Sequence, residues 1–351
     1  MIREGIQKLI EGTDLTYEES GVIMNEVMSG KATNSQTAAF LTALRMKGEA
    51  VDEIIAFATI MKSHCRLIQP KVQGRLVDIV GTGGDKIKTF NISTTAAFVI
   101  AGAGIPVAKH GNRAVTSKSG SADVLEKLGL NLTLEPQAIE GIIERVGVGF
   151  MFAPAFHPAM RYAAEPRREI GIRTVFNILG PLTNPASATA QMIGVYDAKL
   201  VEPMAYALQK LGCQEALVAH GLDGLDEIST VGKTLLAHLK DGKVSIREVT
   251  PAFFGVKPVA PSDLQCGSAE ESAETLFRIL TGKVNSTAKA DIVIVNAAAG
   301  IFVGGKASDF QEAIALAQKS IASGAAYSKL KAMVKASGGN LSKLEELEAH
   351  D

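Results

Sequence analysis

The sequence predicts an α/β protein in which a small N-terminal all-helical domain lies beside a larger domain with a mainly parallel sheet flanked by helices. Two observations support this prediction. The first 65 residues carry apolar side chains at helical spacing only. From Arg75 onward, short β-rich runs alternate with helical runs. We place the domain boundary between residues 72 and 73, so that the two domains span 1–72 and 73–351.

Helix start and stop signals define the N-terminal domain. Thr16 begins a T-Y-E-E capping-box pattern, and Asn34 or Ser35 could cap the next helix, which Gly48 would end. The expected helical runs are VIMNEVM, QTAAFLTALRMK and VDEIIAFATIMKSHC.

The second domain alternates strands and helices, which is typical of βαβ units. Asp241–Gly242 lies between two strand-like runs and predicts a hairpin over residues 234–249. The run DIVIVNAAAG is expected to begin as a strand and continue as a helix, and two helices are expected to end the chain. The other expected strands lie near residues 76–80, 105–108, 148–152, 188–196 and 215–220, and the helices between them near 94–104, 121–129, 137–147, 158–170 and 200–212.

Composition excludes several classes of protein. Lys and Arg total 36 against 37 acidic residues, so the balance is not the strongly basic one typical of nucleic-acid binding, and we expect no nucleic-acid partner. The cysteines Cys65, Cys213 and Cys266 have no C-x-x-C spacing, which argues against a disulfide framework or a zinc site. The first residues are too polar for a signal peptide, and no apolar run reaches the ~20 residues of a membrane helix. We therefore expect a cytoplasmic protein without a membrane partner.

A glycine-rich loop, DIVGTGGD, follows the first expected strand and precedes a helix. Glycines let the backbone approach a ligand closely, and converging N–H groups at a helix start can bind phosphate oxygens. Asn91, Ser93 and Thr94 add amide and hydroxyl groups at the same helix start. The dinucleotide pattern fails because Lys86 stands where its third glycine would be. The alternative is a simple turn in which Asn91 only caps the helix.

A second polar loop, KHGNRAVTSKSGSAD, follows the next expected strand. In a parallel sheet, both loops lie at the same carboxyl edge, where ligands of open α/β sheets bind. Two neighbouring loops rich in glycine, hydroxyls and cations suit a ligand with more than one phosphate, although a solvated charge run is the alternative. The loop carries Lys109, His110, Asn112, Arg113, Thr116, Ser117, Lys118, Ser119 and Ser121.

The motifs GTGGD, NISTTAAFV, KHGNR, GIRTVFNILGPLTNP and GLDEIS, in this order, resemble those of the anthranilate phosphoribosyltransferases. The resemblance extends over essentially the whole chain. It implies the nucleoside phosphorylase/phosphoribosyltransferase fold, a homodimer, and a helical insertion near residues 165–187 that packs on the N-terminal domain. Pyrimidine nucleoside phosphorylases share this fold but differ at these motifs.

The resemblance also implies transfer of a phosphoribosyl group from phosphoribosyl pyrophosphate to the amine of anthranilate, in tryptophan biosynthesis. Residues 73–351 would then bind the donor, with Lys109 as a catalytic residue. Asp85 cannot lie bare against phosphate, so we expect it on a ribose hydroxyl or a metal-bound water, or merely capping the loop. The implied donor-binding residues are Gly81, Gly84, Asp85, Thr89, Asn91, Ser93, Thr94, Lys109, His110, Gly111, Asn112, Arg113, Ser117 and Ser121.

Adjacent carboxylates in GLDEIS, Asp226 and Glu227, lie after an expected strand. Such a pair is usually surface charge, but Mg²⁺ prefers oxygen ligands and often combines one or two carboxylates with substrate phosphates. The resemblance makes both residues catalytic metal ligands together with Ser93. We expect two Mg²⁺ ions, held mostly by the donor's pyrophosphate.

Anthranilate requires a partner for its carboxylate, and arginine's planar fork matches a carboxylate. The stretch HPAMRYAAEPRREIGIR offers Arg161, Arg167, Arg168 and Arg173, from which the resemblance selects Arg167, with Gly81 and Asn112 completing the site. The pair Glu165–Pro166 departs from the family pattern, and a proline at this position could kink the helix before Arg167.

The expected reaction is a displacement at the ribose anomeric carbon, governed by alignment and electrostatics. An arylamine is unprotonated at neutral pH, so a strong base is dispensable. His110 or His157 could carry a proton or simply pack. The alternatives are a metal-independent nucleoside phosphorylase on the same fold and a non-catalytic nucleic-acid-binding relative; a dehydrogenase lacks its fingerprint.

Overall fold

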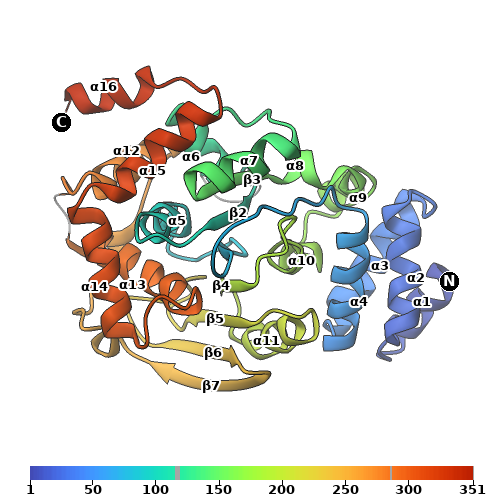
Figure 1. The fold of residues 1–351 in the computed structure, drawn as a ribbon. Helices are drawn as coiled ribbons and strands as arrows, with labels where there is room; N and C mark the ends of the chain where they lie inside the picture. Colours follow the sequence, from blue (N-terminus) through green and yellow to red (C-terminus); the bar gives the residue numbers. More distant parts are fainter. Residues whose placement is uncertain (115–118, 285–286, 351) are drawn as a thin grey trace.

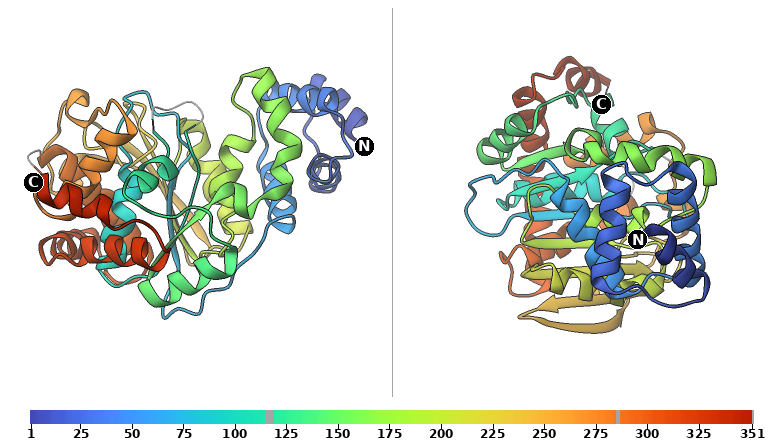
Figure 2. Two further views of the ribbon diagram at one scale, coloured as in Figure 1. Left: turned by 90° about the horizontal axis from the view of Figure 1, so that it is seen from above. Right: turned by 90° about the vertical axis from the view of Figure 1, so that its right-hand side faces the viewer.

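The computed structural model describes residues 1–114, 119–284 and 287–350 of the chain. The N-terminal helices lie at one end of the molecule and the α/β part at the other, with the chain termini far apart (Figures 1 and 2). The N-terminal helices are α1 (Ile2–Ile10), α2 (Tyr17–Met28), α3 (Asn34–Lys47) and α4 (Val51–Ser63).

Side-chain caps begin two of these helices. Thr16 caps α2 with both bonds of a capping box, which confirms that prediction. The predicted cap of α3 is wrong, because Thr33 caps it and the expected Asn34 and Ser35 are already helical. Thr33 is the N-cap because Gln36, three residues later, completes a second capping box with it. Gly48 follows α3 with a positive φ of 91°, which favours glycine.

One seven-stranded sheet forms the centre of the α/β part, in the order β3-β2-β1-β4-β5-β6-β7. The first five strands of this order, β3-β2-β1-β4-β5, pair in parallel, and β6 and β7 add an antiparallel hairpin. The hairpin turns at Asp241 and Gly242, both with positive φ, as the sequence predicts. The strands are β1 (Val77–Gly81), β2 (Val107–Gly111), β3 (Val148–Phe152), β4 (Ala190–Gly194), β5 (Glu215–Gly221), β6 (Thr234–Lys240) and β7 (Lys243–Val249).

Helices cover the sheet and fill the connections between its strands. They are α5 (Ile92–Gly102), α6 (Ser121–Lys127), α7 (Pro136–Val146), α8 (Ala153–Phe156), α9 (Arg161–Ile170), α10 (Phe176–Leu182), α11 (Val201–Lys210), α12 (Ala269–Leu280), α13 (Thr287–Val303), α14 (Phe310–Ala322), α15 (Ala325–Ala336) and α16 (Ser342–His350). Short 3₁₀ turns lie at Pro158–Met160, Ala198–Leu200, Pro251–Phe254 and Pro261–Leu264. The predicted fold class is confirmed.

Two predictions near the C-terminus are wrong. The run DIVIVNAAAG does not begin as a strand, because it lies entirely within the helix α13, and three helices rather than two follow α13. Most side chains of α13 are buried, and it packs against α5, α14 and the strand β4. A helix buried on nearly all sides carries no amphipathic pattern, so its β-branched run resembles a buried strand.

Alternating side chains of the strands build a separate core on each face of the sheet. Met192 and Leu217 belong to the core beneath α5 and α13, whereas their neighbours Ile193 and Val218 belong to the core beneath α10 and α11. This second core is continuous with the N-terminal helices, since α4 packs against α10 and α11.

The helical segment that resembles an insertion lies against the N-terminal helices. Helix α9 contacts α2 and α3, and α10 contacts α4. Pro166 lies inside α9, which continues to Ile170. The domain boundary at residues 72 and 73 stays a prediction. The three cysteines are free thiols. Within the described ranges, no helix has the length and apolar character needed to cross a membrane.

Candidate active site

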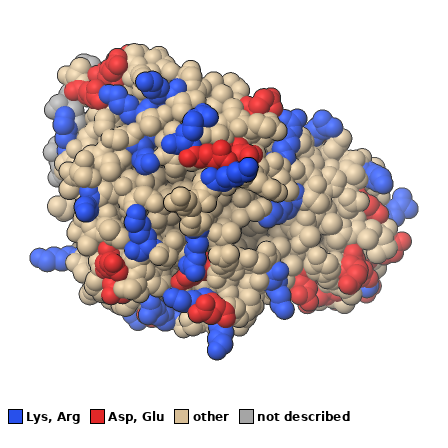
Figure 3. All heavy atoms as spheres, viewed as in Figure 1, with Lys and Arg blue, Asp and Glu red and all other residues tan. Residues whose placement is uncertain are grey.

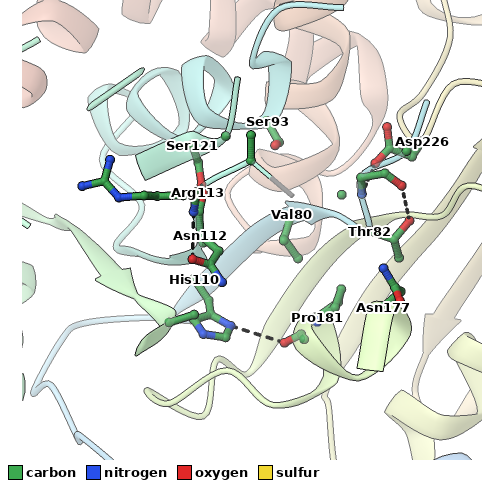
Figure 4. Close-up of a pocket in the computed structure, with 18 of the residues that line it drawn as sticks. Val80, Thr82, Ser93, His110, Asn112, Arg113, Ser121, Asn177, Pro181 and Asp226 are labelled. Carbon is green, nitrogen blue, oxygen red and sulfur yellow. Dashed lines mark hydrogen bonds between the residues drawn. The ribbon is translucent and has the colours of Figure 1, made fainter. Parts of the chain in front are cut away.

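A cavity of about 630 Å³ opens at the carboxyl ends of β1 and β2, between the glycine loop, the second polar loop and the helices α9 and α10 (Figure 4). The predicted residue Ser117 lies outside the described residues, as do Thr116 and Lys118. All other predicted site residues line the cavity: Gly81, Gly84, Asp85, Thr89, Asn91, Ser93, Thr94, Lys109, His110, Gly111, Asn112, Arg113, Ser121, Arg167, Asp226 and Glu227.

The glycine loop contacts the loop after β5 that carries Asp226 and Glu227, here called the acidic loop. The Gly83 N–H donates a hydrogen bond to Asp226 Oδ2 over 2.7 Å, and Gly83 and Gly84 both have positive φ. A side chain at Gly81 would collide with the Asp226 carboxylate. Glycine is therefore required both for backbone conformation and for close approach.

Asp85 and Asn91 both have hydrogen-bond partners within the protein. Asp85 Oδ2 accepts a hydrogen bond from the Thr89 N–H at 2.9 Å, as expected if it caps the loop. Asn91 occupies the N-cap position of α5 but makes no side-chain cap bond. Its Oδ1 instead accepts hydrogen bonds from Ser119 and Ser272, both at 2.9 Å. Asn91 thus joins the second polar loop to α12, and the alternative in which it only caps the helix is wrong. Its role in donor binding stays a prediction.

Lys109, on β2, lines the cavity and reaches from β2 to β1 and to the start of α5. Its Nζ donates hydrogen bonds to the Ile79 carbonyl oxygen at 2.6 Å and to Ser93 Oγ at 3.3 Å. Burial lowers the pKa of Lys109, while the carboxylates of Asp78, Glu227 and Asp226 act in the opposite direction. The ammonium is therefore balanced by several buried acids.

Asp78 is a buried acid to which the sequence assigns no role. Burial raises its pKa to about 6, against the opposing effects of Lys109 and of a 2.7 Å hydrogen bond from Asn184 Nδ2. The same Asn184 amide donates to the Ala108 carbonyl at 2.9 Å. Asp78 and Asn184 thus anchor the strand that carries Lys109.

Asp226 and Glu227 are 8% and 6% exposed, so they are not surface charge. Burial and the neighbouring Asp85 raise the pKa of Asp226 to about 7. Burial and Asp226 raise the pKa of Glu227 to about 8, and its Oε1 accepts a hydrogen bond from the Ser93 N–H at 3.2 Å. A cation bound beside these two carboxylates would stabilise their ionised forms, which burial and mutual repulsion disfavour.

Arg113 lines the cavity but is held by acids on α6. Its guanidinium donates two hydrogen bonds to Glu126, at 2.8 and 2.9 Å, and one to Asp123 at 3.0 Å. Figure 4 shows the side chain extending away from Asp226 on the far side of the cavity. On the same loop, Ser121 Oγ donates to the Asn112 carbonyl at 3.3 Å. The donor-binding role of Arg113 stays a prediction.

Arg167 extends from α9 over the ring of Phe176, with its guanidinium carbon 5.3 Å from the ring centroid. Burial lowers its pKa. Among the described residues, no carboxylate forms an ion pair with Arg167. A half-buried guanidinium without a carboxylate partner is a ready site for an anionic ligand.

His110 and His157 lie side by side in the lining of the cavity, with ring centroids 4.9 Å apart. Burial lowers the pKa of His110 to about 3 and that of His157 to about 4. Both rings are therefore neutral at pH 7, and their low pKa makes them weak proton acceptors. His110 Nδ1 lies 3.3 Å from the Gly180 carbonyl oxygen, which agrees with a packing role.

Sequence reasoning missed several lining residues, among them Thr82, Met160 and Asn177, and it considered Arg173 only as an unselected candidate for the anthranilate carboxylate. Asn177 belongs to the motif GIRTVFN, which carries the resemblance, but no role was assigned to Asn177 itself. Position within that motif was the available signal.

The described fold sets a helical bundle beside a largely parallel sheet, with the cavity at the carboxyl edge of that sheet. Models of the glycosyl transferase family match this chain, the a/b domain over residues 73–327 and the helical bundle domain over residues 3–65. Within that class, relatives that are 48–49% identical over nearly their whole length show that the chain belongs to the anthranilate phosphoribosyltransferase family.

Curated relatives and solved structures agree on this family. The chain is 48% identical to the anthranilate phosphoribosyltransferase of Alkaliphilus metalliredigens, over 96% of this chain and 98% of the relative. It is 51% identical to that of Methanosarcina barkeri, over 91% and 86%. The Thermus thermophilus enzyme structure is similar with a TM-score of 0.89 and 41% identity, covering 95% of this chain and 99% of that one. The Saccharomyces cerevisiae enzyme in complex with PRPP and Mg has a TM-score of 0.88 and 28% identity, covering 96% and 98%.

Proposed function

We propose that this chain transfers the phosphoribosyl group of phosphoribosyl pyrophosphate to the amine of anthranilate, giving N-(5-phosphoribosyl)anthranilate and pyrophosphate in tryptophan biosynthesis. One observation carries the proposal. A single cavity joins a phosphate-binding end, built from the glycine loop and Lys109, to an end where Arg167 has no carboxylate partner among the described residues. A polyanionic donor and a small aromatic acid suit the two ends.

The residues of the acidic loop fit Mg²⁺. Asp226 and Glu227 each use one carboxylate oxygen in a hydrogen bond to a backbone N–H, and carboxylates can accept more. Within the described ranges, no cluster of three or more His, Cys, Asp or Glu could hold a metal by itself. Mg²⁺ commonly combines one or two carboxylates with substrate phosphates and waters, so Asp226, Glu227 and the Ser93 hydroxyl would hold it together with the donor. The number of ions, two, stays a prediction.

The chain's own residues account for alignment and charge. Mg²⁺, when bound, would neutralise charge that grows on the departing pyrophosphate. Lys109 places its ammonium beside Ser93 and the glycine loop, where it stabilises the same charge without reorganisation. Arg167 would hold the anthranilate carboxylate, so that the neutral amine faces the anomeric carbon. The neutral His110 and His157 line the intervening space and help to exclude water.

The experiment that tests the function follows product fluorescence with purified protein, phosphoribosyl pyrophosphate and anthranilate, with and without Mg²⁺. We expect product formation that requires all three components. Product-free reactions with both substrates and Mg²⁺ present, or phosphorolysis of a pyrimidine nucleoside without metal, would refute the proposal in favour of the phosphorylase alternative.

Replacing Arg167 by Ala should raise the KM for anthranilate by about 10- to 100-fold, because a bidentate carboxylate contact is lost. The KM for the donor should change little. Steady-state kinetics with each substrate varied in turn measure both values. Arg168→Ala is the matched control, since Arg168 lies on the same helix with its side chain 78% exposed. An unchanged anthranilate KM in Arg167→Ala would place the carboxylate elsewhere.

A homodimer and a cytoplasmic location stay predictions that rest on the resemblance and on the sequence. The nucleic-acid-binding alternative is not favoured, because Lys and Arg intermingle with Asp and Glu on the face shown in Figure 3 and the net charge is -1.

A further inference from the structure

Arg173 lies in the segment between α9 and α10 and contacts two parts of the chain that are distant in sequence. Its Nη2 donates a hydrogen bond to the Gly84 carbonyl oxygen at 3.0 Å. Its guanidinium carbon lies 4.2 Å from the centroid of the Tyr196 ring. A planar guanidinium makes both contacts at once, because its edge donates hydrogen bonds while its face stacks on the ring.

Two separate parts of the chain hold the glycine loop. Gly84 has a φ of 86°, and a side chain at this position would collide with the Arg173 guanidinium. The loop after β5 provides further contacts: the Gly83 N–H donates to Asp226 Oδ2 at 2.7 Å, and the Lys86 N–H donates to the Gly224 carbonyl at 3.2 Å. The loop after β5 and Arg173 thus both hold the glycine loop in place.

Tyr196 joins the Arg173 contact to the glycine loop a second time. Its N–H donates a hydrogen bond to Thr82 Oγ1 at 3.1 Å, so it is itself joined to the glycine loop. Burial raises the pKa of Tyr196, and the charges of Arg45 and Glu49, near the end of α3, also act on its hydroxyl. The stacked pair Arg173 and Tyr196 therefore contacts the glycine loop at both Gly84 and Thr82.

We propose that Arg173 is a positioning residue for the donor, which fixes the peptide between Gly84 and Asp85 in the orientation that the donor's phosphates require. The proposal rests on the proposed function, because it assigns the glycine loop to phosphoribosyl pyrophosphate. A trans peptide is planar, so holding the Gly84 carbonyl toward Arg173 also fixes the direction of the Asp85 N–H. Without Arg173, this peptide can rotate, and the loop must be ordered when the donor binds.

The test compares Arg173→Gln and Arg173→Lys with the unaltered chain. In Arg173→Gln, we expect the donor KM to rise by about 10- to 100-fold, with the anthranilate KM changed by less than about 2-fold. Arg173→Lys should fall between the two, because an ammonium can still donate to the Gly84 carbonyl but loses the planar stacking. Calorimetric titration with the donor and Mg²⁺ alone should show the same loss in donor affinity.

The melting temperature separates positioning from general stability. Arg173 is half-buried, so its loss should lower the melting temperature by no more than about 3 °C. Arg168→Gln, an exposed arginine on α9, should keep unaltered kinetics. An unchanged donor KM, or equal losses for both substrates, would overturn the proposal. Failure of the unaltered chain to form product would instead refute the proposed function, while the titration with donor still tests Arg173.

Discussion

Replacing Asp226 by Asn together with Glu227 by Gln should lower turnover by at least about 10³-fold while the protein stays folded. The two amides keep the size of the acids and can still accept hydrogen bonds from the Gly83 and Ser93 N–H groups. What they lose is the negative charge that Mg²⁺ requires. Initial rates of product formation at saturating substrates and Mg²⁺ measure the effect.

The same variant should be as stable as the unaltered chain or more stable near pH 8. The folded-state pKa values of about 7 and about 8 lie above the ordinary values of 3.8 and 4.5 for Asp226 and Glu227. An acid with a raised pKa binds its proton more tightly in the folded state than in the unfolded state. Its ionisation therefore lowers the stability of the fold as the pH rises from the ordinary pKa through the folded-state pKa. The amides avoid this cost, and their advantage in melting temperature should shrink toward pH 5.

Glu345→Gln with Glu346→Gln is the matched control, since these adjacent acids are exposed on α16 and undergo the same change of charge. It should keep both the activity and the melting temperature. A double variant at Asp226 and Glu227 with more than about one tenth of the original turnover would contradict the metal assignment.

Replacing Lys109 by Met should lower kcat/KM for the donor by about 10²- to 10³-fold, because it removes from a preorganised, buried position the cation that we propose to stabilise the donor's phosphates. Methionine retains much of the stem, which is 3% exposed, so the loss reports on the charge more than on packing. Kinetics with the donor varied at saturating anthranilate measure the effect, and donor kinetics equal to those of the unaltered chain would remove Lys109 from the site.

The stability of Lys109→Met should depend on pH in a defined direction. Lys109 lowers the folded-state pKa of Asp78 and Glu227, so its removal raises both values further above those of the unfolded chain. Their ionisation then costs more stability as the pH rises. At low pH, by contrast, the variant is spared the burial of an ammonium beside protonated acids. Relative to the unaltered chain, its melting temperature should therefore fall between pH 5 and pH 8, and a constant difference would contradict this account.

The parts of the fold with local signals were predictable from the sequence. The Asp241–Gly242 hairpin and the Thr16 capping box depend on a few neighbouring residues, and both were predicted correctly. The strand expected in DIVIVNAAAG was wrong because only the tertiary structure buries α13 on nearly all sides. Local propensity favours strand for a β-branched run, and packing between α5 and the sheet overrides it.

For the site, motifs at the ends of strands predicted which residues line the cavity, because parallel topology brings the loops after β1 and β2 to one edge. They did not predict the partners of individual side chains. Arg173 reaches Gly84 across 89 residues of sequence, and Arg113 binds Glu126 instead of facing the cavity centre. Such contacts depend on side-chain directions that a one-dimensional pattern does not contain.

The continuous core between α4, α10 and α11 has a consequence for engineering. The two family domains match residues 3–65 and 73–327, yet the apolar layer does not end between them, because Phe57 and Met204 belong to one core. A chimera that takes residues 1–72 from another member of the family would have to bring matching side chains on α10 and α11. Exchanging residues 1–72 without such repacking would leave apolar side chains of α10 and α11 exposed on the α/β part, and exposed apolar patches promote aggregation.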